Sequence, residues 1–453
     1  MHGRSRLVTV ALSTMVLALL VGATWGFQSS QAKQGIDKPT LFPEQTTSAS
    51  DILTLPSYIL AGGQNGLWFY PSQYPELYKV NFSSNGHATV PLSTAPGFGT
   101  VWSGGWNGSN WLITGWGWGD SEGLNPYFDV YDSQAQTQLS FSNYTQAGAA
   151  EEEWSGGDVF STTWNGSTWL LTGMGSGVLD PSDGATNHYS MAFLTSNGTF
   201  IDLSQSIPQN QDGILYASAW NGSSWLVGGG YYDFNVGVLY SVSPDGNIVD
   251  ITSLFTQWVH NFNAVQSIAW NGTDWMVGGA NFLAEYNPST GAVYDLTGAL
   301  DFALNANDSL SSLLTNSVNS IVWTGKVWMI AGGAPVGYWG TENQTAWVAS
   351  LDPQSGKFSD ITSQAIPSSI LSGSSMSGIL SMACNDIGCV LGGFAGNSPV
   401  LIWYNGSGAI DLSNTIPSGD MTYVQWVGVS VGAAPTFTVP AHTPLPFPRV
   451  LLP

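Results

Sequence analysis

The stretch Trp220-Asn-Gly-Ser-Ser-Trp-Leu-Val-Gly-Gly229 decides the fold, because near copies of it recur along the chain. The paired Trp residues return as Trp106 and Trp111, Trp164 and Trp169, Trp270 and Trp275, and, in a degenerate copy, Trp323 and Trp328. Successive copies begin 58, 56, 50 and 53 residues apart. Asn-Gly between apolar residues is a strong signal for a tight β-hairpin. Each copy therefore predicts two antiparallel strands joined by a short turn.

The residues after each Trp pair complete a four-stranded unit. An apolar strand ends at Gly-Gly, as in Met276–Gly279. An aromatic strand follows, then a tight turn such as Asn287–Gly291, and then a strand carrying Asp, Leu or Ile, and Ser or Thr. Such a unit repeated at this spacing is typical of a β-propeller, in which each sheet buries its faces against its neighbours. We therefore expect an all-β propeller of four-stranded antiparallel blades.

The Gly-Gly strand followed by an aromatic strand and a turn resembles the kelch repeat, the form also seen in galactose-oxidase-like propellers. The resemblance covers about residues 51–432. It implies a kelch-like propeller fold and carries no activity with it. The sequence departs from the kelch pattern at Val293-Tyr294-Asp295, where kelch repeats have a Trp.

The spacing of the copies predicts seven blades. Five steps separate Trp106 from Cys384, with a mean of 55.6 residues, and residues 51–432 hold about seven such repeats. The additional blade begins at Tyr58–Gly63, and its innermost strand is either Ile52–Leu55 or Val424–Val431. We favour the second strand, because closing the ring with both ends of the chain leaves no open sheet edge.

The two cysteines take the place of a Trp pair. Aligning Leu391-Gly-Gly393 with the other Gly-Gly strands puts Cys384 and Cys389 where the two Trp residues stand elsewhere. Paired residues at this position contact each other across the hairpin. We therefore predict a structural disulfide, which indicates an oxidising compartment.

The ends of the chain predict export. Arg4 and Arg6 precede the apolar run Leu7–Gly22, so residues 1–27 are expected to form a signal peptide or an uncleaved N-terminal anchor, and we favour cleavage. Residues 28–50 form a polar linker, residues 51–432 the propeller and residues 433–453 a Pro-rich tail. We expect a secreted or cell-surface, extracytoplasmic protein.

Asn-x-Ser/Thr sequons suit a glycosylated exported surface. They begin at Asn81, Asn107, Asn143, Asn165, Asn197, Asn221, Asn271, Asn307, Asn343 and Asn405. The alternative is that most of them are hairpin turns, which favour Asn-Gly in any case.

The charge balance excludes several functions. The chain has 8 Lys and Arg against 30 Asp and Glu, so neither a basic patch for nucleic acid nor the arginine cluster of a sialidase can be built. It also lacks the Tyr-His pair of the galactose-oxidase copper site, and H-E-x-x-H, G-x-S-x-G and P-loop motifs. Because few basic residues can charge the protein in acid, we predict that it stays folded at pH 2–3 in an acid-living microbe.

Loop lengths point to one face of the propeller. The connections from second to third strand, and from each blade to the next, are long and variable and share one face, here called the loop face; tight turns cover the other. Its ligand-binding candidates are Trp116, Trp118, Asp120, Tyr231, Tyr232, Asp233, Tyr338 and Trp339. Its acidic or metal-binding candidates are Glu151, Glu152, Glu153 and Asp158, with Asp180, Asp183 and His188 in a neighbouring loop.

Aromatic rings beside carboxylates suit a sugar, whereas carboxylates alone suit Ca²⁺. We expect no cofactor, with calcium as the possible exception. Our first expectation is a non-catalytic propeller that binds a carbohydrate or a partner protein through the loop face. The alternative is an acid-active extracellular hydrolase or lyase that uses paired carboxylates. A structural component of the cell surface is a third option. We expect no nucleic acid partner, and membrane contact only through an uncleaved N-terminal segment.

Overall fold

The computed structural model describes residues 58–427 apart from several gaps. The gaps are 66–73, 84–85, 93–97, 119–123, 132–137, 140–156, 176–187, 197, 209–212, 232–235, 306–316, 335–343, 373–375, 386–387, 397 and 417–419. The predicted signal segment, linker and Pro-rich tail lie outside the described residues, so these boundaries stay predictions. Within the described part of the chain, no helix is long and apolar enough to cross a membrane.

Strands make up most of the described residues. They are β1 (Tyr58–Asn65), β2 (Tyr74–Ser83), β3 (Gly86–Pro91), β4 (Phe98–Trp106), β5 (Trp111–Trp118), β6 (Leu124–Tyr131), β7 (Gln138–Leu139), β8 (Asp158–Trp164), β9 (Thr168–Gly175), β10 (His188–Thr195), β11 (Phe200–Asp202), β12 (Ile214–Trp220), β13 (Trp225–Gly230), β14 (Gly237–Val242), β15 (Ile248–Asp250), β16 (Val265–Trp270), β17 (Trp275–Gly279), β18 (Phe282–Asn287), β19 (Ala292–Asp295), β20 (Ser317–Trp323), β21 (Trp328–Gly333), β22 (Trp347–Asp352), β23 (Lys357–Asp360), β24 (Ser377–Cys384), β25 (Cys389–Ala395), β26 (Ser398–Tyr404), β27 (Ala409–Asp411) and β28 (Asp420–Val427). Short helices follow some outer strands: η2 (Ser204–Ser206), α3 (Thr252–Thr256), α4 (Thr297–Asn305), α5 (Thr362–Ala365), α6 (Ser368–Leu371) and η4 (Ser413–Thr415).

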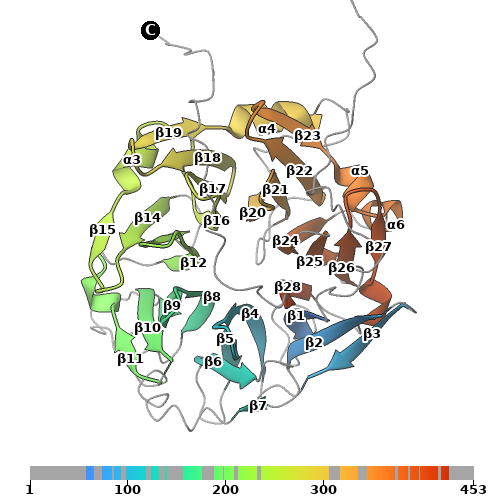
Figure 1. Ribbon diagram of the computed structural model, residues 1–453, viewed down its shortest axis with the longest axis horizontal. Coiled ribbons are helices and arrows are strands. Elements are labelled where there is room, and N and C mark those ends of the chain that lie inside the picture. The colour runs from blue at the N-terminus through green and yellow to red at the C-terminus, as the bar shows by residue number, and fades with distance from the viewer. Residues whose placement is uncertain are drawn as a thin grey trace, which may run out of the picture. The chain divides into compact units, whose positions relative to one another are not determined.

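The strands form antiparallel four-stranded sheets in chain order, such as β4-β5-β6-β7 and β12-β13-β14-β15. The pairing of Gly333 with Gly378 joins β20–β23 and β24–β27 into one larger sheet. Figure 1 shows the sheets arranged around a common centre, with one edge strand of each sheet nearest to it. These inner strands, β4, β8, β12, β16, β20, β24 and β28, contact one another in succession, and β28 contacts β4. The arrangement is that of a β-propeller-like fold.

Both ends of the described chain build the sheet that closes the ring. Its strand order is β28-β1-β2-β3, so the last strand of the chain pairs with the first. This confirms the expected closure by C-terminal residues, although the strand is Asp420–Val427 rather than Val424–Val431. Serine hydroxyls join other inner strands: Ser103 Oγ accepts the N–H of Thr162 at 3.0 Å, and Ser267 Oγ accepts that of Ile321 at 2.8 Å.

The Trp pairs face each other across their hairpins as predicted. Trp220 and Trp225 lie opposite in the register, their rings are 4.4 Å apart, and Trp225 is buried. In the turn between them, Asn221 Oδ1 accepts the backbone N–H groups of Ser223 and Ser224, while Gly222 has φ of +97°. The sequons at Asn107, Asn165 and Asn271 use Oδ1 in the same way in equivalent turns. Asn405 does so in the turn between β26 and β27.

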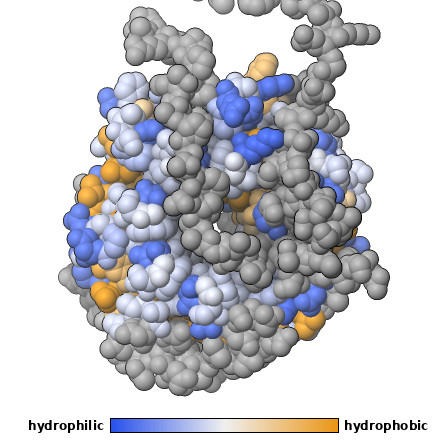
Figure 2. Space-filling view, in the orientation of Figure 1, coloured by the Kyte–Doolittle hydropathy of each residue, from blue (hydrophilic) through white to orange (hydrophobic). Residues whose placement is uncertain are grey.

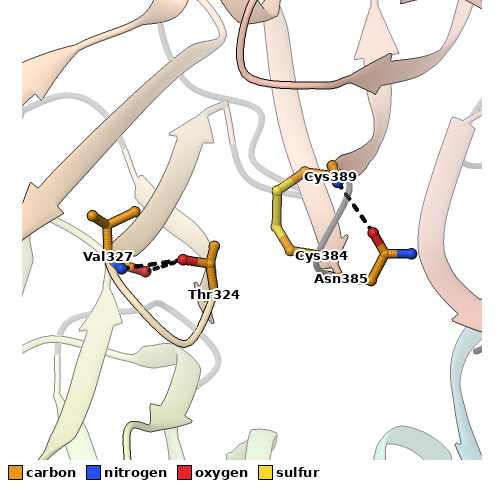
Figure 3. The surroundings of a disulfide bond; sticks show 6 residues. Thr324, Val327, Cys384, Asn385 and Cys389 are labelled. Atoms are coloured by element: carbon orange, nitrogen blue, oxygen red, sulfur yellow. Dashed lines mark hydrogen bonds between the residues drawn. A yellow bond between two sulfur atoms is a disulfide. The ribbon is translucent and has the colours of Figure 1, made fainter. Parts of the chain in front are cut away.

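The disulfide replaces one such pair, as predicted. Cys384 and Cys389 are bonded and lie opposite each other on β24 and β25 (Figure 3). In their turn, Asn385 Oδ1 accepts the Gly388 N–H at 3.1 Å. The neighbouring sheet, whose turn holds Thr324 and Val327, keeps the Trp pair.

The Asp-x-Ser/Thr signature fastens five outer strands to their sheets, namely β11, β15, β19, β23 and β27. Asp250 Oδ1 accepts the Thr252 N–H at 2.8 Å, and Thr252 Oγ1 accepts the Leu239 N–H at 3.0 Å. The same clamp recurs at Asp202 with Ser204, Asp295 with Thr297, Asp360 with Thr362, and Asp411 with Ser413. The repeated Asp-x-Ser/Thr motif therefore corresponds to a repeated hydrogen-bond pattern.

The Gly-Gly strands allow the inner strand of the same sheet and the side chains of the next sheet to approach closely. A Cβ on Gly229 would lie 2.0 Å from the Ile214 carbonyl oxygen of the inner strand. A Cβ on Gly228 would lie 2.3 Å from Val265 Cγ1 of the next sheet. Apolar layers between adjacent sheets, such as Leu239 against Val277, form the core. Apolar side chains are also exposed, Trp258 and Phe302 among them, and Figure 2 shows apolar patches along the flank that carries β15 and α3.

Candidate active site

The candidate site lies where the inner strands begin, at the loop face. Each inner strand from β4 to β24 carries one additional residue there, because the pairing register shifts by one. These residues, here called the bulge row, are Trp102, Phe160, Tyr216, Gln266, Asn319 and Leu380. β-bulges are over-represented beside active sites, because they redirect a side chain away from the sheet.

Three consecutive members of the bulge row are aromatic and in contact. Trp102 stacks on Phe160 with ring centroids 5.0 Å apart and an interplanar angle of 25°. Phe160 meets Tyr216 edge to face at 5.3 Å. Phe160 and Tyr216 are half-buried, so each keeps part of its surface exposed. The rings form a continuous aromatic surface across β4, β8 and β12.

The next two members of the bulge row are amides. Gln266 is half-buried, and its Oε1 is buried without a hydrogen-bond partner. Asn319 Nδ2 donates to the carbonyl oxygens of Ala334 at 3.2 Å and Ile379 at 3.0 Å, which fixes the orientation of its side chain. A buried acceptor without a partner is costly, so the Gln266 oxygen is a candidate contact for a bound hydroxyl.

Asp158 is a buried carboxyl group in this region. It is the first residue of β8, lies opposite Met174 on β9, and is 7% exposed. Its Oδ1 is buried without a hydrogen-bond partner. Burial without a compensating charge disfavours the carboxylate and raises the pKa of Asp158 to about 8. Asp158 is therefore a neutral acid at pH 7, able to give up a proton.

Asp158 differs in chemistry from the residues at the equivalent position on the neighbouring inner strands. They are Thr100, Ile214, Ala264, Ser317 and Gly378, none of which is ionisable. On the closing strand the equivalent is Asp420, which lies opposite Gln64 just beyond the register shift. Sequence reasoning missed Asp420, because its position follows only from the pairing of β28 with β1. The ring of inner strands thus carries an aspartate on β8 and another on β28, with β4 between these two strands.

The structure corrects the placement of several candidates. Asp158 and His188 begin strands β8 and β10 instead of lying in loops, and Trp116 and Trp118 belong to β5. The reason is that strand pairing continues further than the sequence indicated, as with Trp118 opposite Leu124. Tyr231 follows β13 and is half-buried.

Asp158 and His188 do not form a catalytic pair. His188 lies opposite Gly175, one position beyond the Met174 that faces Asp158. Because side chains alternate between the two faces of a sheet, Asp158 and His188 point to opposite faces. Both ring nitrogens of His188 are buried without a hydrogen-bond partner.

The remaining candidates lie outside the described residues. They are Asp120, Glu151, Glu152, Glu153, Asp180, Asp183, Tyr232, Asp233, Tyr338 and Trp339, together with the sequons at Asn143, Asn197, Asn307 and Asn343. Asn81 lies on β2. Over the described ranges, no group of His, Cys, Asp and Glu is arranged to hold a metal ion. The calcium site expected around Glu151–Glu153 stays a prediction.

The described lysines lie away from this site. Lys79 is buried on β2 with its Nζ 4.2 Å from the centroid of the Tyr58 ring. Lys326 lies in the tight turn after β20, and Lys357 begins β23 after another tight turn. Within the described part of the chain, no lysine or arginine therefore lies at the start of an inner strand.

No protein-family model matches the chain, and no curated protein matches it. Among solved structures, a "putative 6-phosphogluconolactonase" from Bacteroides uniformis is similar at 10% sequence identity, with a TM-score of 0.46 over 82% of this chain and 99% of that chain. A protein of the same description from Bacteroides fragilis is similar at 10% identity, with a TM-score of 0.47 over 83% and 99% of the two chains. We carry no substrate or residue role over from these proteins.

These comparisons correct our first expectation. Both similar structures are of proteins named "putative 6-phosphogluconolactonase", which is the name of an enzyme. This finding contradicts our first expectation of a non-catalytic binding protein. Similarity at this level carries no activity over to this chain, so a hydrolase is a proposal.

Proposed function

We propose that the protein is a hydrolase in which Asp158 is the general acid. The observation that carries this proposal is the buried, neutral Asp158 carboxyl group at the loop-face end of β8, beside the aromatic bulge row. Carboxyl groups whose pKa is shifted this strongly, without an ion pair to explain the shift, are concentrated at functional sites. A carboxylic acid that keeps its proton at neutral pH can protonate a leaving oxygen.

The chemistry needs two groups. Water attacks the carbon of a C–O bond while Asp158 gives its proton to the leaving oxygen, and the bond breaks to release an alcohol. The proton that the attacking water loses passes to a second carboxylate, and exchange with solvent restores both groups. We propose Asp420 for the second role, because it stands at the register position equivalent to Asp158 on β28.

The proposal also includes the fold type and the cellular location of the enzyme. We propose a single seven-bladed propeller of kelch type, supported by the closed succession of inner strands and the repeated Gly-Gly strands. The disulfide and the apolar segment near the N-terminus support export to an extracytoplasmic compartment, with cleavage of the segment favoured over anchoring. Glycosylation of the turn sequons and an acid environment belong to the same proposal.

Hydrolysis of chromogenic esters, lactones and glycosides, all uncharged, tests the assignment. We expect at least one class to be turned over, and Asp158→Asn to lower kcat by about a hundredfold or more, as loss of a general acid does. Asp420→Asn should lower kcat to a similar degree. The matched control is Asp245→Asn, which changes an exposed carboxylate in the tight turn between β14 and β15. Full activity in folded Asp158→Asn would refute the assignment.

A further inference from the structure

The bulge row offers one apolar wall at the level of Asp158. Phe160 lies two residues after Asp158 on β8, and Tyr216 lies two residues after the equivalent position on β12. The contact between the two rings joins their surfaces, and neither ring is fully buried. Aromatic surfaces of this kind hold ligands by excluding water from an apolar face.

The same row offers polar contacts on the strands that follow. Gln266 on β16 carries a buried Oε1 without a partner, and Asn319 on β20 is fixed by its two Nδ2 hydrogen bonds. Ligand sites combine apolar walls with a few fixed polar groups in this way. A ligand that matches the row needs one apolar face and hydroxyl groups at its edge.

The positions of the charged residues further limit which ligands the bulge row can bind. No described lysine lies at the start of an inner strand, and every arginine lies outside the described residues, at positions 4, 6 and 449. Among the described residues, a phosphate or carboxylate on the substrate would therefore lose its hydration without gaining a cationic partner, which is unfavourable. An uncharged ligand avoids this cost.

We propose that the bulge row is the substrate-binding subsite for an uncharged, polyhydroxylated ring. The ring packs its C–H face on Phe160 and Tyr216, and a ring hydroxyl donates to Gln266 Oε1. This inference deepens the proposed hydrolase and rests on it for the fate of the ligand. It also predicts weaker binding of phosphorylated sugars, because no described lysine or arginine lies at this site to pair with a phosphate.

Binding to Asp158→Asn tests the inference without turnover. The probes are methyl β-D-glucopyranoside, D-glucono-1,5-lactone and, as the charged counterpart, D-glucose 6-phosphate, measured by calorimetry and saturation-transfer NMR. We expect at least one uncharged probe to bind and the phosphorylated sugar to bind at least about tenfold more weakly. Tyr216→Ala and Gln266→Leu should each weaken binding of the uncharged probe by about tenfold. The control Trp258→Ala, which removes an aromatic ring that is 61% exposed, should leave binding unchanged.

The outcomes separate the two proposals. Gln266→Leu preserves side-chain volume, so it tests the row even where an alanine variant fails to fold. Failure of both uncharged probes to bind, equal binding of the phosphorylated sugar, or unchanged binding in Tyr216→Ala and Gln266→Leu refutes the subsite. Binding that depends on the row, without turnover of any substrate by the wild-type protein, leaves the subsite standing and refutes the hydrolase.

Discussion

Replacing Asp158 by Asn should remove a large part of the pH dependence of stability. In the folded protein the pKa of Asp158 is about 8, whereas the ordinary value for an unfolded chain is 3.8. Between these two values the unfolded chain binds fewer protons than the folded protein, so stability falls as pH rises. Below pH 4 both states are protonated, and the contribution of the neutral acid is fully present. Asn keeps the shape of the side chain and cannot ionise.

The magnitude follows from the size of the shift. One pKa unit corresponds to about 1.4 kcal/mol, so the free energy of unfolding should fall by about 6 kcal/mol between pH 4 and pH 8 on account of Asp158. A loss of this size is a large fraction of the stability of a typical domain. It represents the cost of ionising a carboxyl group that the fold keeps away from water and from positive charge.

Urea unfolding of wild-type and Asp158→Asn proteins, followed by Trp fluorescence from pH 4 to pH 8, measures this difference. We expect the stability of the variant relative to wild type to rise by about 1.4 kcal/mol for each pH unit in this range. Asp245→Asn, which changes an exposed turn, should run parallel to wild type. A variant whose stability follows the wild-type pH slope would refute the neutral-acid argument.

Three further predictions concern the fold. Burial and the neighbouring charge of Asp274 raise the pKa of Glu285 to about 7, so Glu285→Gln should flatten the fall in stability between about pH 4.5 and pH 7. Urea midpoints across that range measure the change, and a slope equal to that of the wild type would count against the prediction. Replacing both Cys384 and Cys389 by Ala should lower stability by about 2 kcal/mol, as expected for closing a short loop, and denaturant midpoints equal to those of the oxidised wild type would contradict this. Trp225→Ala should cost about 3–5 kcal/mol because the ring is buried, whereas exposed Trp258→Ala should stay within about 0.5 kcal/mol; similar thermal shifts in both variants would be the contrary result.

The sequence predicted the local units well, because each depends on residues close in the chain. The Trp pairs, the Asn-Gly turns and the Cys384–Cys389 bond are contacts across a single hairpin. The Asp-x-Ser/Thr pattern was visible as a repeat, and its meaning as a clamp on the third strand appeared only in the structure. Ring closure was inferred from the need to cover a sheet edge.

The site was harder to predict, because it depends on contacts between sheets. The sequence placed Asp158 beside Glu151–Glu153 as part of an acidic loop, and nothing in that run shows that β8 would bury it. The contact between Phe160 and Tyr216 could not be predicted, because it joins positions 56 residues apart in the sequence. Asp420 required the register of β28 on β1. Residues of the long loops stay candidates that the described structure does not place.

The most direct test of the account is the titration of the Asp158 carboxyl group itself. Infrared difference spectra between wild-type protein and Asp158→Asn isolate the C=O band of one protonated carboxyl group as pH is raised. The account predicts that this band persists through neutral pH and disappears with a midpoint near pH 8. Loss of the band with a midpoint near pH 4, the ordinary value for aspartate, would contradict the claim that the fold holds a neutral acid at this site.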